Sequence, residues 1–116
     1  MAEESFGKYF RAIRTSQNLT QEKVAEIVGR KKMTISLIEQ EKNNSPSGKL
    51  LTDMINSLSL TDEDIINRLY LLASKSRGLV PDDIMDYFYS NEEIYGAIKR
   101  GMNQKQDNRK WKEIFK

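Results

Sequence analysis

Apolar residues recur every three to four positions along most of the chain, with charged and polar residues between them, as in amphipathic helices. No stretch alternates apolar and polar residues over the length of a useful strand. The pattern therefore predicts an all-α protein of seven or eight helices. The expected ranges are about 5–18, 21–28, 32–41, 47–57, 61–78, 81–89 and 91–102, with a final turn or two near 111–115.

The expected helix starts carry side chains that can cap the first backbone N–H groups. The predicted caps are Ser5, Thr20, Ser47, the segment 61–64, and Ser90 with Glu93 as a capping box. The helix that begins near Lys32 has no such cap, because Arg30 and Lys31 precede it. Cations at this end oppose the helix dipole, a cost that nearby phosphates would offset.

Residues 20–39 predict two short helices around one obligatory turn. Two helices that cross steeply need a small residue at their contact, here Ala25, and the turn needs Gly29 for a left-handed backbone. Ile35 and Ile38 then bury one stripe of the second helix. Another face of that helix is left for other contacts: Lys32, Met33, Ser36 and Leu37.

Further positions occur in register with this motif. They are Phe10-x-x-Ile13-Arg14, Leu19-Thr20-Gln21-Glu22-x-Val24-Ala25, Gly29, Thr34-Ile35-Ser36-x-Ile38-Glu39, Pro46, and the apolar residues Leu50, Leu51, Ile55 and Leu58. In this combination residues 5–66 resemble the phage-repressor-like (Xre/Cro/CI) helix-turn-helix family. The resemblance implies a five-helix DNA-binding domain over residues 1–66. Two or three C-terminal helices in residues 67–116 would serve dimerisation or partner binding.

The resemblance also implies that the second helix of the motif enters the major groove of double-stranded DNA. Lys32, Met33, Ser36 and Leu37 match positions that reach base edges, with Lys32 suited to guanine and Met33 or Leu37 to a thymine methyl group. Glu39 is expected to pair with an arginine such as Arg14. The positions expected at backbone phosphates are Gln21, Lys31, Thr34, Gln40, Lys42, Asn43 and Asn44.

The sequence departs from the family pattern at three places. Arg30 stands where the family usually has an apolar residue, and Lys31-Lys32-Met33 replaces the usual polar or glutamine-rich start of the second helix. No glycine follows that helix between Glu39 and Pro46. These departures leave the exact register of the base contacts open.

Composition excludes several classes of site. The chain has 116 residues, 38% of them hydrophobic and 31% charged, and it has no cysteine and no histidine. Zinc sites of the usual ligands, disulfides, Ser-His-Asp triads and Cys-His dyads are therefore excluded. With no apolar run long enough for a membrane span and no signal-peptide core, we expect a cytoplasmic protein with no cofactor and no enzymatic activity.

Charge is distributed unevenly along the chain. Residues 1–60 carry nine Lys/Arg against seven Asp/Glu, residues 61–98 three against eight, and residues 99–116 seven against two. Basic ends around an acidic middle suit contact of both ends with a polyanion, or docking of the tail on its own acidic segment. Solvated surface charge explains the tail equally well.

The carboxylates near the last helices allow two interpretations. A site for Mg²⁺ or Ca²⁺ is one, and helix capping with dipole complementarity is the simpler one. The residues concerned are Asp82, Asp83, Asp86, Glu92 and Glu93.

Residues 80–111 look like the C-terminal helices of small regulators found on mobile elements and beside toxin genes. Their aromatic residues Tyr87, Phe88, Tyr89 and Tyr95 favour a core or a dimer interface over a ligand pocket. Trp111, Ile114 and Phe115 either pack back on the domain or form a helix that binds a partner.

We therefore expect a DNA-binding transcriptional regulator, a repressor that acts as a homodimer. The alternative is an antitoxin or antagonised regulator whose residues 80–116 bind a protein partner, with DNA binding for autoregulation.

Overall fold

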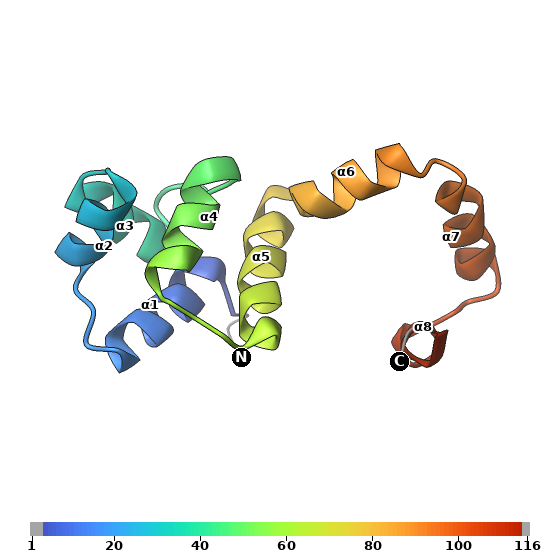
Figure 1. Ribbon diagram of the computed structural model, residues 1–116, viewed down its shortest axis with the longest axis horizontal. Helices are drawn as coiled ribbons and strands as arrows, with labels where there is room; N and C mark the ends of the chain where they lie inside the picture. The colour runs from blue at the N-terminus through green and yellow to red at the C-terminus, as the bar shows by residue number, and fades with distance from the viewer. Residues whose placement is uncertain (1–3, 115–116) are drawn as a thin grey trace. The chain divides into compact units, whose positions relative to one another are not determined.

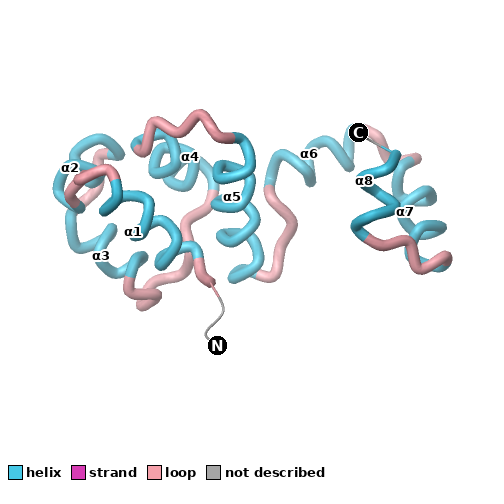
Figure 2. Tube along the Cα trace, turned by 90° about the horizontal axis from the view of Figure 1, so that it is seen from below, coloured by secondary structure: helices cyan, strands magenta, loops and turns pink. Residues whose placement is uncertain are grey.

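The computed structural model describes residues 4–114, which form α-helices joined by loops and contain no strand (Figures 1 and 2). The all-α prediction is confirmed for this part of the chain. The helices are α1 (Phe6–Ser16), α2 (Gln21–Val28), α3 (Lys32–Glu39), α4 (Gly48–Ser57), α5 (Glu63–Arg77), α6 (Asp82–Ser90), α7 (Ile94–Asn103) and α8 (Asn108–Ile114). Phe115 lies outside the described residues. None of the described helices is both long enough and apolar enough to cross a membrane.

The chain divides into two compact units, an N-terminal unit of residues 1–82 and a C-terminal unit of residues 83–116. This division comes later than the boundary expected after residue 66. The reason is that α5 runs without interruption from Glu63 to Arg77 and packs against α1 and α4. Its residues Leu69 and Leu72 are buried with the core of the N-terminal unit.

The N-terminal unit has one hydrophobic core, to which each of α1–α5 contributes. Phe6 and Phe10 stack in it with ring centroids 5.7 Å apart. Burial of these apolar side chains supplies the main favourable term for folding. The core members are Phe6, Phe10, Val24, Ala25, Ile35, Ile38, Leu51, Met54, Ile55, Leu58, Leu69, Leu72 and Ala73.

Three of the predicted caps form as expected. The side-chain oxygens of Ser5, Thr20 and Asp62 accept hydrogen bonds from backbone N–H groups in the first turns of α1, α2 and α5, at 3.2, 3.0 and 2.9 Å. At the other end of α5, Gly78 takes the left-handed conformation (φ 70°) that ends a helix.

Other predicted termini are wrong. The third helix ends at Glu39, two residues before the predicted end at Glu41, which has a positive φ of 62°. Ser47 occupies the N-cap position of α4, but its side chain makes no capping hydrogen bond. The capping box of Ser90 and Glu93 does not form, because α6 extends through Ser90 and Glu93 is itself the N-cap of α7.

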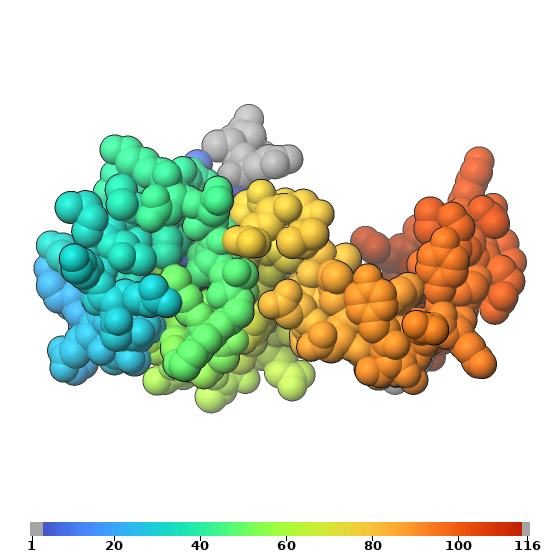
Figure 3. Space-filling model, turned by 90° about the horizontal axis from the view of Figure 1, so that it is seen from above, coloured from blue at the N-terminus to red at the C-terminus, as the bar shows by residue number. Residues whose placement is uncertain are grey.

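The C-terminal unit packs much more loosely within its described residues. Gly101 is its only buried residue there, and the ring of Trp111 lies so close to Gly101 that a Cβ atom at that position would stand 2.8 Å from Trp111 Cζ2. Phe88 and Tyr95 meet edge to face, with centroids 6.2 Å apart. Trp111 thus packs on α7, within its own unit, and most apolar side chains of the unit remain at the surface, where Figure 3 shows α6 and α7 in orange.

Candidate nucleic-acid interface

The turn between α2 and α3 has the geometry that its sequence predicts. Gly29 is left-handed, with φ 70° and ψ 36°, and the N–H of Arg30 donates to the carbonyl of Ala25 at 2.9 Å. Ala25 is buried where α2 packs against its neighbours. A residue with a Cβ atom is strained at the positive φ of Gly29, so this glycine fixes the angle at which α3 leaves α2.

The inner side of α3 is buried. Ile35 and Ile38 belong to the core, and α3 packs against both α2 and α1. The contact with α1 depends on Gly7, where an added Cβ would collide with the carbonyl oxygen of Ile38 and stand 2.9 Å from that of Glu39. The role of Gly7 was not predicted from the sequence. The available signal was a glycine in the first turn of a predicted helix, since glycine is normally unfavourable in helices.

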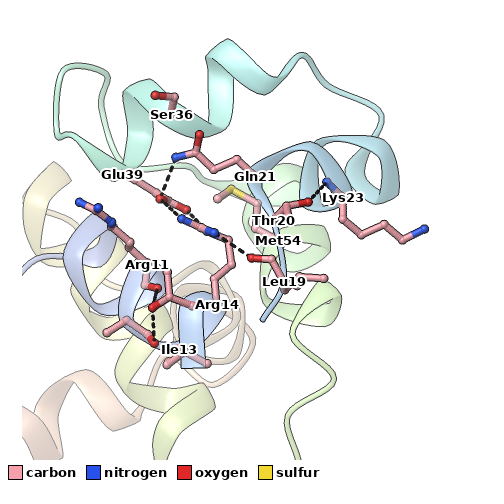
Figure 4. A network of polar contacts seen from close by, with 12 residues as sticks. Arg11, Ile13, Arg14, Leu19, Thr20, Gln21, Lys23, Ser36, Glu39 and Met54 are labelled. Carbon is pink, nitrogen blue, oxygen red and sulfur yellow. Dashed lines mark hydrogen bonds and ion pairs between the residues drawn. The ribbon is translucent and has the colours of Figure 1, made fainter. Parts of the chain in front are cut away.

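A buried polar network ties α3 to α1 and to the start of α2 (Figure 4). The guanidinium group of Arg14 donates to both carboxylate oxygens of Glu39, from Nε at 2.7 Å and from Nη2 at 2.8 Å. Its Nη1 donates to the carbonyl of Leu19 at 2.8 Å, and Gln21 Nε2 donates to Glu39 Oε1 at 3.0 Å.

This network confirms that Glu39 is a structural partner of Arg14. Both side chains are almost fully buried, and a two-point pair of this kind fixes orientation as well as distance. Gln21, predicted to meet a phosphate, directs one amide N–H at Glu39, and its second N–H has no intramolecular acceptor among the described residues.

The outer face of α3 brings together the four residues predicted to reach base edges. Lys32 and Met33 are exposed, Met33 to 66%, and Ser36 and Leu37 are half-buried. Ser36 Oγ accepts a hydrogen bond from Gln40 Nε2 at 2.6 Å, which leaves its hydroxyl proton available. The face therefore presents one ammonium group, one hydroxyl group and two apolar side chains, the exposed Met33 and the half-buried Leu37.

Lys32 has a partner in the free protein that the sequence interpretation did not identify. Its Nζ lies 2.7 Å from Oε1 of Glu22, across the turn on α2. The hydrogen bond from Lys32 lowers the pKa of the Glu22 carboxyl group below its ordinary value. Glu22 thereby offsets part of the unfavourable positive charge at the start of α3.

The start of α3 lacks a side-chain cap, as expected. Lys31 occupies the N-cap position without a capping hydrogen bond. Thr34, in the first turn, is half-buried. The N–H of Thr34 donates to the carbonyl of Lys31 at 3.0 Å, and no side chain caps the earlier N–H groups of α3.

The remaining predicted phosphate contacts lie in the loop after α3. The backbone N–H groups of Lys42 and Asn43 donate to the carbonyl of Leu37 at 2.9 and 3.3 Å, so the loop folds back onto the end of the helix. Lys31, Lys42, Asn43 and Asn44 are all exposed. Among residues 4–114, none of their side chains forms a hydrogen bond or ion pair within the chain, so their polar groups are available to a ligand.

Residues 4–114 contain no group of three or more acidic side chains placed to hold a metal ion, and this includes the carboxylates of residues 82–93. Comparison with protein-family models, with curated proteins and with solved structures finds no match to this chain.

Proposed function

We propose that this chain is a sequence-specific, double-stranded DNA-binding transcriptional regulator, a repressor that acts as a homodimer. The observation that carries the proposal is the two-sided character of α3. Its inner side is fixed by apolar burial and by the Arg14–Glu39 pair, whereas its outer side exposes Met33 beside Lys31 and Lys32. A rigid helix with an exposed apolar side chain beside cations is suited to a groove lined by phosphates.

Each part of this surface has a suitable partner in the major groove. Lys32 would donate to O6 and N7 of guanine, and Met33 would contact the methyl group of thymine. Ser36 can donate to or accept from a base edge. Lys31, Lys42, Asn43 and Asn44 would hold the backbone on either side of α3 and set its register.

Lys32 has to leave Glu22 when it binds a base. Both side chains are more than half exposed, and ion pairs between exposed groups are readily exchanged because solvent screens them. Glu22 is then left as an unpaired carboxylate near the phosphate backbone. It would disfavour binding to DNA sequences in which Lys32 finds no guanine. The pair in this way supports specificity more than affinity.

The homodimer follows from the geometry of such binding. One copy of α3 reads a single half-site, whereas two copies on one face of the DNA read half-sites about 34 Å apart and combine their binding energies. Occupancy of a promoter by such a dimer represses transcription by occlusion.

A binding-site selection with the full-length protein tests the proposal, with Lys32→Ala and Lys42→Ala as a matched pair of charge-removing variants. Lys32→Ala should relax the preference at one base position by about 1–3 kcal/mol. Lys42→Ala should weaken binding to all DNA sequences alike. It should also reduce the slope of log K against log[salt] by about 1, the loss of one phosphate contact.

Failure of the wild-type protein to enrich any sequence would refute the proposed function. Unchanged discrimination in Lys32→Ala, together with enrichment by the wild type, would refute only the role of Lys32.

A second candidate function rests on the apolar side chains at the surface of the C-terminal unit. An antitoxin or antagonised regulator would use residues 80–116 to bind a protein partner, with DNA binding for autoregulation. This candidate requires a defined complex with a different protein, whereas the leading proposal requires only a second copy of the chain.

A further inference from the structure

The exposed apolar surface of the C-terminal unit includes a continuous stripe on α7. Tyr95, Ile98 and Met102 follow one another at i, i+3 and i+7, the spacing that places them on one helix face. They are 57%, 39% and 62% exposed. The rings of Tyr95 and Phe88 meet edge to face, and more than half of the Tyr95 surface still remains accessible.

The C-terminal unit needs an external contact for stability. A unit of this length falls below the roughly 40 residues at which a chain usually requires disulfides, metal ions or oligomerisation to fold. The chain has no cysteine or histidine, and residues 83–114 contain no buried hydrophobic side chain. Of these three options, oligomerisation is the one that the composition allows.

The charges of this part of the chain are separated but complementary. Residues 82–93 carry five carboxylates and no Lys or Arg, and residues 99–112 carry six Lys or Arg and a single Asp. None of these charged side chains forms an ion pair with another described residue. A second copy of the same surface, turned through a two-fold rotation, would supply both missing partners.

We infer that α7 pairs antiparallel with α7 of a second copy, about a two-fold axis that passes beside Ile98. The stripe is nearly symmetric about this residue, which stands three positions after Tyr95 and four before Met102. Ile98 therefore lies close to Ile98 of the partner, and Tyr95 meets Met102 in both directions. An aromatic ring with a thioether is a favourable pair. The inference deepens the proposed function by assigning the contact that makes the homodimer, and it rests on that function only for the relevance of the dimer to DNA.

Charge selects the antiparallel arrangement. Glu92 and Glu93 lie at the start of α7, and Lys99 and Lys105 lie toward its end and just beyond it. Antiparallel helices place the acidic start of one copy near the basic end of the other and also oppose the two helix dipoles favourably. Parallel helices would place like charges side by side, which specific interfaces avoid.

Disulfide cross-linking tests the arrangement directly, because the wild-type chain contains no cysteine. Full-length Ile98→Cys should form a covalent dimer under mild oxidation, since the two thiols meet at the axis. Ala97→Cys is the matched control, because its neighbouring position points to another side of α7. A cross-link as efficient at residue 97 as at residue 98 would overturn the inference.

A mixture of Tyr95→Cys and Met102→Cys distinguishes antiparallel from parallel helices. The mixture should cross-link between the two variants, whereas Tyr95→Cys alone should not. In the antiparallel pair its two copies stand about 10 Å apart along the axis, beyond the roughly 7 Å limit for Cα atoms in a disulfide. Cross-linking of Tyr95→Cys with itself would indicate parallel helices and overturn the inference.

A charge exchange tests the same interface without covalent chemistry. Glu92→Lys/Glu93→Lys and Lys99→Glu/Lys105→Glu should each raise the dimer dissociation constant at least about tenfold in sedimentation velocity, through like-charge repulsion. Mixing the two variants should restore dimers, because opposite charges then meet at both ends. Emission from Trp111, the single tryptophan, shows whether each variant keeps the wild-type C-terminal unit.

Three further outcomes would overturn the inference. Wild-type protein that stays monomeric at all concentrations, as docking of the basic tail on its own acidic segment would cause, overturns it. So does a lack of dimers in the mixture, or a stable complex only with a different protein. These measurements contain no DNA, so their failure is distinct from failure of the binding-site selection.

Discussion

The two units of this chain are built from similar amphipathic helices, but they differ in how far their apolar side chains are buried and their charged side chains are paired. In the N-terminal unit, hydrophobic side chains from Phe6 to Ala73 form one core, and the most buried charges, Arg14 and Glu39, bond to each other. In the described part of the C-terminal unit, only Gly101 is buried. Apart from Glu113, the charged side chains there form no ion pair with another described residue.

This difference separates two meanings of an amphipathic pattern. An apolar stripe on a helix indicates that this face is buried against another element. The pattern does not indicate whether that element belongs to the same chain. Five helices give the N-terminal unit enough elements to cover one another. Three short helices do not, so the apolar stripe of the C-terminal unit is available for a second polypeptide.

The largest effect is expected from breaking the buried pair of the N-terminal unit. Arg14→Met leaves the Glu39 carboxylate buried with only the Gln21 amide as a donor, and it should lower the free energy of unfolding by about 3–5 kcal/mol. Urea unfolding, monitored by far-ultraviolet circular dichroism, measures this free energy.

Arg68→Met is the matched control, because Arg68 pairs with Glu4 at 3.5 Å and both side chains are exposed. This change should cost less than about 1 kcal/mol. Equal losses in the two variants would show that Arg14 and Glu39 are not held together in a buried site.

An intermediate effect is expected at Gly7. Alanine is better than glycine in a helix interior by about 1 kcal/mol, yet Gly7→Ala should destabilise the N-terminal unit by about 1–3 kcal/mol, because its methyl group meets backbone carbonyls of α3 that cannot move aside cheaply.

Gly96→Ala provides the comparison from the C-terminal unit. There the added Cβ meets only Arg100 Nη1, at 3.4 Å, a flexible side-chain atom. Unfolding of the N-terminal unit should change by less than about 0.5 kcal/mol. The same urea titration measures both variants, and a stabilised Gly7→Ala would contradict the close approach of α1 to α3.

The smallest effect concerns a surface pair of the N-terminal unit. Lys32→Met should raise the pKa of the Glu22 carboxyl group toward its ordinary value, because the hydrogen bond from Lys32 is the largest cause of its lowering. Lys23→Met should leave that pKa low, since Lys23 pairs with Glu26. Carboxyl chemical shifts in an NMR pH titration measure the difference.

The sign of the linkage follows from the lowered pKa. The folded protein holds the Glu22 proton less tightly than the unfolded chain, so the pair stabilises the fold above the ordinary carboxyl pKa. That contribution disappears as the pH falls through the lowered value, and it is small because Glu22 is exposed. An unchanged Glu22 titration in Lys32→Met would rule out the pair in solution.

The turn between α2 and α3 was largely predictable because its residues are constrained by local geometry. A left-handed turn requires a residue such as Gly29, and a close helix crossing requires a small residue such as Ala25. The pair of Arg14 with Glu39 was also expected, because both positions belong to one sequence pattern.

Other features were missed because they depend on what lies opposite in space. The need for Gly7 comes from carbonyl groups of α3, and the partner of Lys32 comes from α2. The capping box at Ser90 failed because the extent of α6 was not encoded in the cap residues themselves.

The sequence by itself determined the helical class, most helix starts, the turn at Gly29 and the residues on each face of α3, because spacing and local sterics act over a few neighbouring residues. Only the tertiary structure decided that α5 belongs to the N-terminal core and that α7 keeps its apolar stripe exposed. Burial is a property of the whole packed unit: a stripe of the same composition is covered where enough helices surround it and stays open where they do not.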